Sequence, residues 1–279
     1  MKLTTKSSSL LIAILAASTI GGTMVSAASA TELDSTGKVT VTGDGDTGGP
    51  EIDEDGKPVI PDPEEGGKTT PTNPDEVDVN GEKGALKVEA VSKLNFGEVK
   101  TTAKEINQFA SSLSMDGGKN RGALVTFADV RSEAFGYTLQ AKMKEQFKSG
   151  ENVLNGSTIT YNYGIARQED GNDNIPGSLT KGNDIVLGMK DDKTGEAVTI
   201  FTADGAKKEG KGRYVIEFGQ SKEYDASVKP APAGSNLGTG TVDTADKAVK
   251  LTIPMKTASS MAKGAYTATV TWSLATVAE

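Results

Sequence analysis

An unbroken alternation of apolar and hydroxyl-bearing side chains runs through residues 266–275, close to the carboxyl end of the chain. Its even positions share one face of an extended backbone and are Tyr266, Ala268, Val270, Trp272 and Leu274, whereas the odd positions from 267 to 273 are threonine or serine. This period of two predicts a strand that meets a core on one side and water on the other. The chain ends five residues after Leu274. We therefore expect the fold itself, rather than a sorting motif or anchor after this strand, to hold the protein on a cell.

Other strand-like runs recur from Gly84 onward, separated by clusters of glycine, asparagine and aspartate that favour turns. They lie near residues 86–91, 123–127, 135–143, 157–163, 184–187, 197–202, 213–218 and 249–253. One run, residues 104–113, has a weak helical period and predicts a short helix. The pattern predicts an all-β domain over residues 84–279, an antiparallel β-sandwich of the immunoglobulin-like or a related kind, with a closed antiparallel barrel as the alternative.

The first 30 residues have the composition of an export signal. Lys2 and Lys6 precede the apolar run 10–17, and small residues lead to Ala30. We predict a signal peptide over residues 1–30. A permanent anchor is the alternative, but the run is about half the length that a spanning helix needs. The chain has no cysteine, hence no lipobox cysteine and no disulfide framework. A secreted, extracellular protein of a Gram-positive cell surface fits these features.

Charge and aromatic residues are distributed unevenly along the chain. Residues 43–83 hold 13 acidic residues and three lysines, a balance of −10, whereas residues 84–279 hold 24 basic and 23 acidic residues, a balance of +1. All phenylalanine, tyrosine and tryptophan residues lie after Gly84. A segment without aromatic residues buries little apolar area, so residues 31–83 are predicted to be a disordered, acidic Pro/Gly-rich spacer. An acidic arm that recruits a cationic partner is the alternative interpretation.

The composition excludes most catalytic chemistry. The chain has neither histidine nor cysteine, which excludes Ser-His-Asp and thiolate nucleophiles and leaves only carboxylates for zinc. Asp170, Asn172 and Asn174 resemble the start of a calcium loop, but Ile175 and Lys181 stand where a glycine and an acid are required, so turn chemistry is favoured. We therefore predict no catalytic residue, no metal site and no cofactor. Nucleic-acid binding is not expected, because the domain is neutral and the spacer repels phosphate.

Several short segments together resemble the WxL-domain surface proteins of low-GC Gram-positive bacteria. In chain order they are Leu94-Asn95-Phe96-Gly97, Asp129-Val130-Arg131, Gly136-Tyr137-Thr138-Leu139, Leu154-Asn155-Gly156-Ser157 and the strand from Tyr266 to Leu274. The strand at the carboxyl end is the most specific of them. Such proteins usually carry two Trp-x-Leu motifs, and the first here reads Tyr137-Thr138-Leu139. Tyrosine suits a buried strand position only if its hydroxyl reaches a partner or water.

The resemblance implies non-covalent attachment to the cell wall through the carboxyl-terminal domain, with peptidoglycan as the ligand. It also implies assembly with other cell-surface proteins, including a membrane-anchored one, and no membrane span of the chain's own. Two roles therefore stay open: a wall-binding protein, and a subunit of a surface adhesion complex whose domain mainly binds a membrane-anchored partner. A hydrolase that uses a carboxylate pair is a third class, but the sequence selects no such pair.

The candidate binding or signature residues are Tyr137, Leu139, Trp272 and Leu274. Each pair shares a strand face, so it forms either an exposed platform for sugar rings or part of the core. The core interpretation is favoured, because a strand with so many apolar residues on one face seldom exposes all of them. Asp129 and Arg131 are candidates for locking a turn or for contacting a ligand. The lysines at 142, 144 and 148 suit either anionic wall polymers or plain solvation.

Overall fold

The structure is a computed structural model that describes residues 37–41, 43–190, 194–227 and 236–277. The predicted signal peptide, residues 1–30, lies outside this range. The chain divides into two compact units, residues 1–41 and 42–279, and the description below concerns the second. No helix within the described ranges is long and apolar enough to cross a membrane.

The regular secondary structure of the second unit is almost entirely β-strand. In chain order they are β1 (Glu51–Ile52), β2 (Pro58–Pro61), β3 (Lys68–Thr69), β4 (Val77–Val79), β5 (Leu86–Ser92), β6 (Ile106–Phe109), β7 (Leu113–Met115), β8 (Lys119–Arg121), β9 (Ala123–Asp129), β10 (Tyr137–Ser149), β11 (Asn152–Val153), β12 (Thr158–Tyr161), β13 (Gly164–Gln168), β14 (Ser178–Leu179), β15 (Ile185–Lys190), β16 (Thr194–Gly195), β17 (Val198–Ala203), β18 (Gly212–Phe218), β19 (Val249–Ile253) and β20 (Thr267–Thr276). The helices are the short η1 (Pro74–Glu76), η2 (Asp116–Gly118) and α1 (Met255–Ala258).

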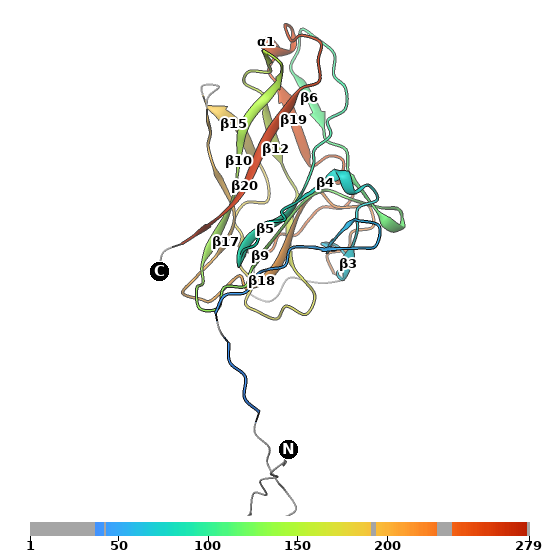
Figure 1. The fold of residues 1–279 in the computed structure, drawn as a ribbon. Helices are drawn as coiled ribbons and strands as arrows, with labels where there is room; N and C mark the ends of the chain where they lie inside the picture. The colour runs from blue at the N-terminus through green and yellow to red at the C-terminus, as the bar shows by residue number, and fades with distance from the viewer. Residues whose placement is uncertain (1–36, 42, 191–193, 228–235, 278–279) are drawn as a thin grey trace, which may run out of the picture. The chain divides into compact units, whose positions relative to one another are not determined.

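Three five-stranded antiparallel sheets form the body of this unit. Their strand orders are β13-β18-β9-β5-β4, then β16-β15-β12-β19-β6, and then β11-β10-β17-β14 with β20 paired to β10. Figure 1 shows β20 running alongside β10, and β5, β9 and β18 together in the neighbouring sheet. Buried residues of all three sheets belong to one continuous hydrophobic cluster. The prediction of an all-β, antiparallel sandwich-type fold is confirmed.

The strands follow the sequence pattern closely, with one error. β19 occupies residues 249–253 as predicted, and β20 differs from the predicted strand by one or two residues at each end. The predicted helix at 104–113 is wrong, because Ile106–Phe109 forms β6 and pairs with β19. A short segment with a weak periodic pattern adopts the conformation in which its backbone can hydrogen-bond to a neighbouring element. Here the neighbouring element is β19, at the edge of its sheet.

The acidic segment requires a correction. A disordered spacer was predicted through residue 83, but β1 to β4 lie within it and β4 extends the sheet next to β5. Ile60 and Val77 are buried in a second hydrophobic cluster with residues of the body such as Leu124 and Val215. The prediction counted apolar residues within the segment alone, whereas its few apolar side chains are buried against the rest of the domain. The compact unit accordingly begins near residue 42 instead of residue 84.

Candidate functional site

The first signature segment lies in the centre of the core. Tyr137 and Leu139 on β10 are both fully buried. The Tyr137 hydroxyl donates a 2.8 Å hydrogen bond to the carbonyl oxygen of Gly210, which is the partner that a buried tyrosine requires. Its ring contacts Phe127 edge-on and stacks on Phe201, with centroids 6.1 and 6.2 Å away. Burial raises the pKa of the Tyr137 hydroxyl well above its usual range, so this side chain stays neutral.

The second signature segment is the direct neighbour of the first. In the register of β10 and β20, Leu139 lies opposite Leu274 and Ala141 opposite Trp272. Trp272 and Leu274 are half-buried and pack on the core cluster from its edge. The indole ring of Trp272 lies 5.8 Å from the ring of Tyr161 and 6.0 Å from that of Phe218. The sequence contained no signal for this pairing, because more than 120 residues separate the two motifs.

Asp129 and Arg131 form an internal ion pair. The guanidinium of Arg131 binds both carboxylate oxygens of Asp129 at 2.9 Å, and the backbone N–H of Arg131 donates to the same carboxylate at 3.0 Å. Lys211 contacts Asp129 at 3.2 Å and donates to the carbonyl oxygens of Arg131 and Ala134. The hydrogen bonds with Asp129 raise the pKa of Arg131 above its ordinary value. These contacts fix the turn that leads into β10.

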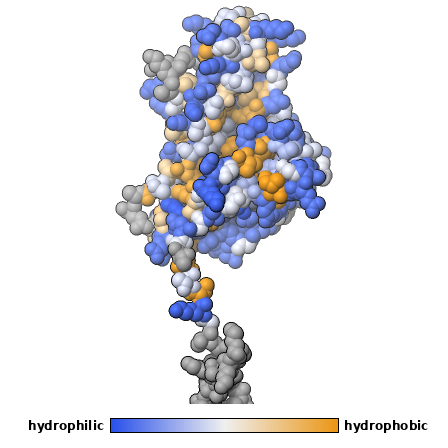
Figure 2. Space-filling view, in the orientation of Figure 1, coloured by the Kyte–Doolittle hydropathy of each residue, from blue (hydrophilic) through white to orange (hydrophobic). Residues whose placement is uncertain are grey.

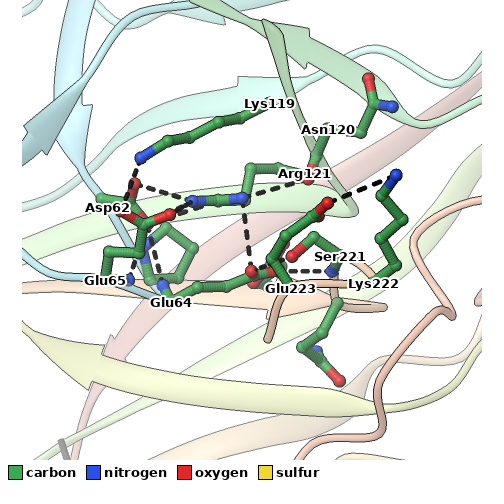
Figure 3. A network of polar contacts seen from close by, with 12 residues as sticks. Asp62, Glu64, Glu65, Lys119, Asn120, Arg121, Ser221, Lys222 and Glu223 are labelled. Atoms are coloured by element: carbon green, nitrogen blue, oxygen red, sulfur yellow. Dashed lines mark hydrogen bonds and ion pairs between the residues drawn. The ribbon is translucent and has the colours of Figure 1, made fainter. Parts of the chain in front are cut away.

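A buried ionic network joins the acidic segment to the body, and sequence reasoning did not find it (Figure 3). Arg121 on β8 is 1% exposed. Its guanidinium contacts the Asp62 carboxylate at 2.9 Å and the Glu64 carboxylate at 3.3 Å. Glu64 accepts further hydrogen bonds from the backbone N–H and the hydroxyl of Ser221. The arginine and its carboxylates lie 59 and 57 residues apart, so no local sequence pattern predicted their pairing.

The network also sets the ionisation of its carboxyl groups. Burial opposes ionisation of Asp62, but the hydrogen bonds and charge of Arg121 outweigh it and hold the Asp62 pKa below its usual range. Glu217 lies close by and is fully buried, and burial together with the charge of Glu64 raises its pKa well above the usual range. Its Oε1 accepts a hydrogen bond from the N–H of Gly122 at 2.9 Å. The protonated form of Glu217 is therefore favoured.

A cavity of about 230 Å³, lined by both polar and apolar residues, opens beside this network. It is lined by Arg167 on β13, the loop 169–172 and the segment 224–226. The Arg167 guanidinium donates to the carbonyl oxygens of Pro63 and Glu64 at 3.3 and 3.1 Å. It also pairs with the Asp170 carboxylate at 3.7 Å. Burial nevertheless lowers the pKa of Arg167, against the opposing charges of Asp170 and Asp62.

The aromatic wall of this cavity is Tyr224, which is half-buried and donates to the carbonyl oxygen of Thr239 at 3.2 Å. Gly240, at φ +62°, allows this packing, since a Cβ there would lie 2.7 Å from the tyrosine ring. The suspected calcium loop borders the cavity but has the hydrogen bonds of a turn: Asn172 Oδ1 accepts from both the backbone and the side chain of Asn174. Within the described ranges, no group of three or more acidic residues is arranged to hold a metal ion.

Fold and site together define a class of protein: an all-β domain in which two separate aromatic-x-leucine segments meet on adjacent strands at the edge of one core. A family model described as "WxL domain surface cell wall-binding" matches residues 28–277. The chain therefore belongs to the WxL family. No curated protein and no solved structure matches it. Membership places the protein at the cell surface as a wall-binding domain and in a family that is not one of enzymes.

Proposed function

We propose that this chain is a secreted, non-enzymatic surface protein that attaches non-covalently to the cell wall through residues 42–279, with peptidoglycan as its ligand. The observation that carries the proposal is the family match across residues 28–277. The chemistry of the domain agrees with it. The chain has no cysteine or histidine, so attachment through the folded domain depends on shape, hydrogen bonds and charge.

The signature residues act, in this proposal, by holding the fold together. Tyr137 and Leu139 are fully buried and so are inaccessible to a polymer. Trp272 is half-buried and packs one side of its ring against Tyr161 and Phe218. Asp129 and Arg131 satisfy one another. Wall binding is accordingly assigned to another part of the surface.

We assign sugar binding to the cavity beside Arg167. Pyranose rings pack on aromatic faces and exchange hydrogen bonds with carboxylates, amides and guanidinium groups, and this cavity combines Tyr224 with Arg167, Asn172 and Asp225. A ligand hydroxyl or carboxylate would add an acceptor to the guanidinium of Arg167, beside its long ion pair with Asp170 at 3.7 Å. Its volume of about 230 Å³ suits a single sugar unit of a chain that continues into solvent.

The test is retention of the purified chain, without its predicted signal peptide, on washed and deproteinised peptidoglycan. We expect retention by the wild-type protein and about a tenfold weaker affinity for the variant Arg167→Ala/Tyr224→Ala, because two central contacts are removed. Lys222→Ala is the matched control, since Lys222 is a nearby exposed cation that does not line the cavity. Equal retention of the double variant and the wild type would show that the cavity does not bind peptidoglycan.

The same experiment separates the other roles. If retention requires a second surface protein, the domain is instead a subunit that binds a membrane-anchored partner. If soluble fragments appear from the purified wall over time, the chain is a hydrolase. Raising the salt concentration identifies electrostatic attachment, which weakens as charges are screened.

A further inference from the structure

β20 is an unusual edge strand. It pairs with β10 on one side, and no described residue hydrogen-bonds to the backbone of its other side. The strands that end the other sheet paths are short: β4, β6, β11, β13, β14 and β16 span two to five residues each. β20 spans ten residues. Although β5 lies near part of β20, the N–H and C=O groups on the second side of β20 have no hydrogen-bonded strand partner.

β20 lacks most of the features that usually protect an edge, although its ladder with β10 has two register shifts. Natural proteins block exposed edges with charged residues, prolines, bulges or short strands. From Thr267 to Thr276 this strand contains no charged residue and no proline. Figure 2 shows apolar residues at the surface in the region where β20 runs in Figure 1. Such an edge is complementary to another extended backbone.

The sequence of β20 indicates that the backbone best suited to pair with this edge is β20 of a second copy. In an antiparallel pair centred on Thr271, hydroxyl residues face hydroxyl residues, with Ser273 opposite Thr269 of a second copy. On the other face Trp272 lies beside Val270, and Leu274 beside Ala268, so each large side chain meets a smaller one. Aromatic with β-branched and threonine with threonine are favourable cross-strand pairs. No charges are placed opposite one another. A two-fold axis allows the same strand to satisfy both copies.

We propose that the chain self-associates through β20, as a two-fold dimer in which two β20 strands pair antiparallel with Thr271 opposite Thr271 of the second copy. The pairing joins the β10-β20 sheets of both copies into one continuous sheet. It satisfies the open backbone edge and covers the exposed flank of Trp272 and Leu274.

Disulfide trapping tests the register, because the native chain has no cysteine. In the chain without its predicted signal peptide, Thr271→Cys should cross-link to a second copy under mild oxidation, since directly opposite Cα atoms lie about 4.5–5.5 Å apart, within disulfide range. Thr269→Cys is the register control. Its copies would be offset by four residues, about 13 Å, which is too far to bridge. Equal cross-linking of the two variants would overturn the proposed register.

Sedimentation tests the association itself. The wild-type mass should rise toward that of a dimer with increasing concentration. Thr269→Lys/Ser273→Lys places lysines directly opposite each other twice and should weaken association about tenfold. Mixing this variant with Thr269→Glu/Ser273→Glu should restore a dimer. Asn120→Lys/Ser111→Lys adds the same charge at exposed positions outside β20 and should change nothing. A wild-type chain that stays monomeric at every concentration would refute the proposal, and would leave the edge to a strand of a different protein.

Discussion

Replacing Arg121 tests whether the acidic segment is held by the buried network. Arg121→Met keeps the length and much of the volume of the side chain but removes the charge. Asp62 and Glu64, which are 3% and 4% exposed, then lose the cation that they surround. Removing one partner of a buried ion pair typically costs about 3–5 kcal/mol. For a unit of this size that corresponds to a melting temperature lower by about 10 °C.

The loss should depend on pH in a specific direction. In the wild type the Asp62 pKa is below its unfolded value, so its contribution to stability is present above the unfolded pKa and is lost as the pH falls through the folded pKa. Without Arg121, only the backbone N–H groups of Glu64 and Glu65 oppose the effect of burial on Asp62, so we expect its pKa to rise. The variant is then most stable at low pH and loses stability as the pH rises through that raised pKa. Glu217, whose pKa is already raised, acts in this second direction in both proteins.

The assay is urea unfolding of wild type and variant between pH 4 and pH 8. The difference in free energy of unfolding should be small at pH 4 and reach about 3–5 kcal/mol near pH 8. Lys119→Met is the control, since its pair with Glu65 is exposed and should be worth at most about 1 kcal/mol at any pH. A loss that is the same at both ends of the pH range would refute the electrostatic explanation and leave only altered packing.

Three further changes test the remaining structural claims. A fragment of residues 84–279 should be less stable than the unit from residue 42 by roughly 5 kcal/mol or more, because it loses the buried Ile60 and Val77 and leaves Arg121 unpaired; comparison of the two by chemical unfolding checks this. Tyr137→Phe should cost about 1 kcal/mol in unfolding free energy, the value of its bond to the Gly210 carbonyl. Trp272→Ala should melt earlier by several degrees yet stay folded and retain wall binding, since the indole is only half-buried and is not assigned to the ligand site; a folded variant that no longer binds peptidoglycan would instead make Trp272 part of the binding platform.

The sequence predicted the features that depend on neighbouring residues. Alternation at period two located β19 and β20, because the two faces of a strand meet different surroundings wherever the strand is half-buried. It also favoured a core position for Trp272, which is half-buried in the structure. The alternation could not show that β20 pairs with β10, since register across such a distance depends on the packing of the whole sheet.

The prediction of a disordered acidic segment was wrong because its order also depends on residues far away in the sequence. Within the segment alone, apolar residues such as Ile60 and Val77 are too few to offset the conformational entropy lost on ordering the chain. Their burial partners, including Leu124 and Val215, lie far along the sequence. The acidic excess of the segment gives no sign of a buried partner when the segment is considered alone, although Asp62 pairs with Arg121 of the body. The composition of a segment reveals neither the distant apolar residues that it packs against nor the distant charged residue that it pairs with.

The tyrosine that replaces the first tryptophan of the motif has a local explanation. Tyr137 is fully buried, so its hydroxyl needs an acceptor, and the carbonyl oxygen of Gly210 provides it at 2.8 Å. Gly210 has φ +87°, and a Cβ at this position would lie 2.4 Å from the side chain of Ala203 and 2.9 Å from the Tyr137 ring. The glycine therefore supplies both the space for the ring and the acceptor for its hydroxyl. Tyr137 and Gly210 depend on one another, so a larger indole at 137 would require this loop to move, and the departure from the family pattern follows from the packing of this core.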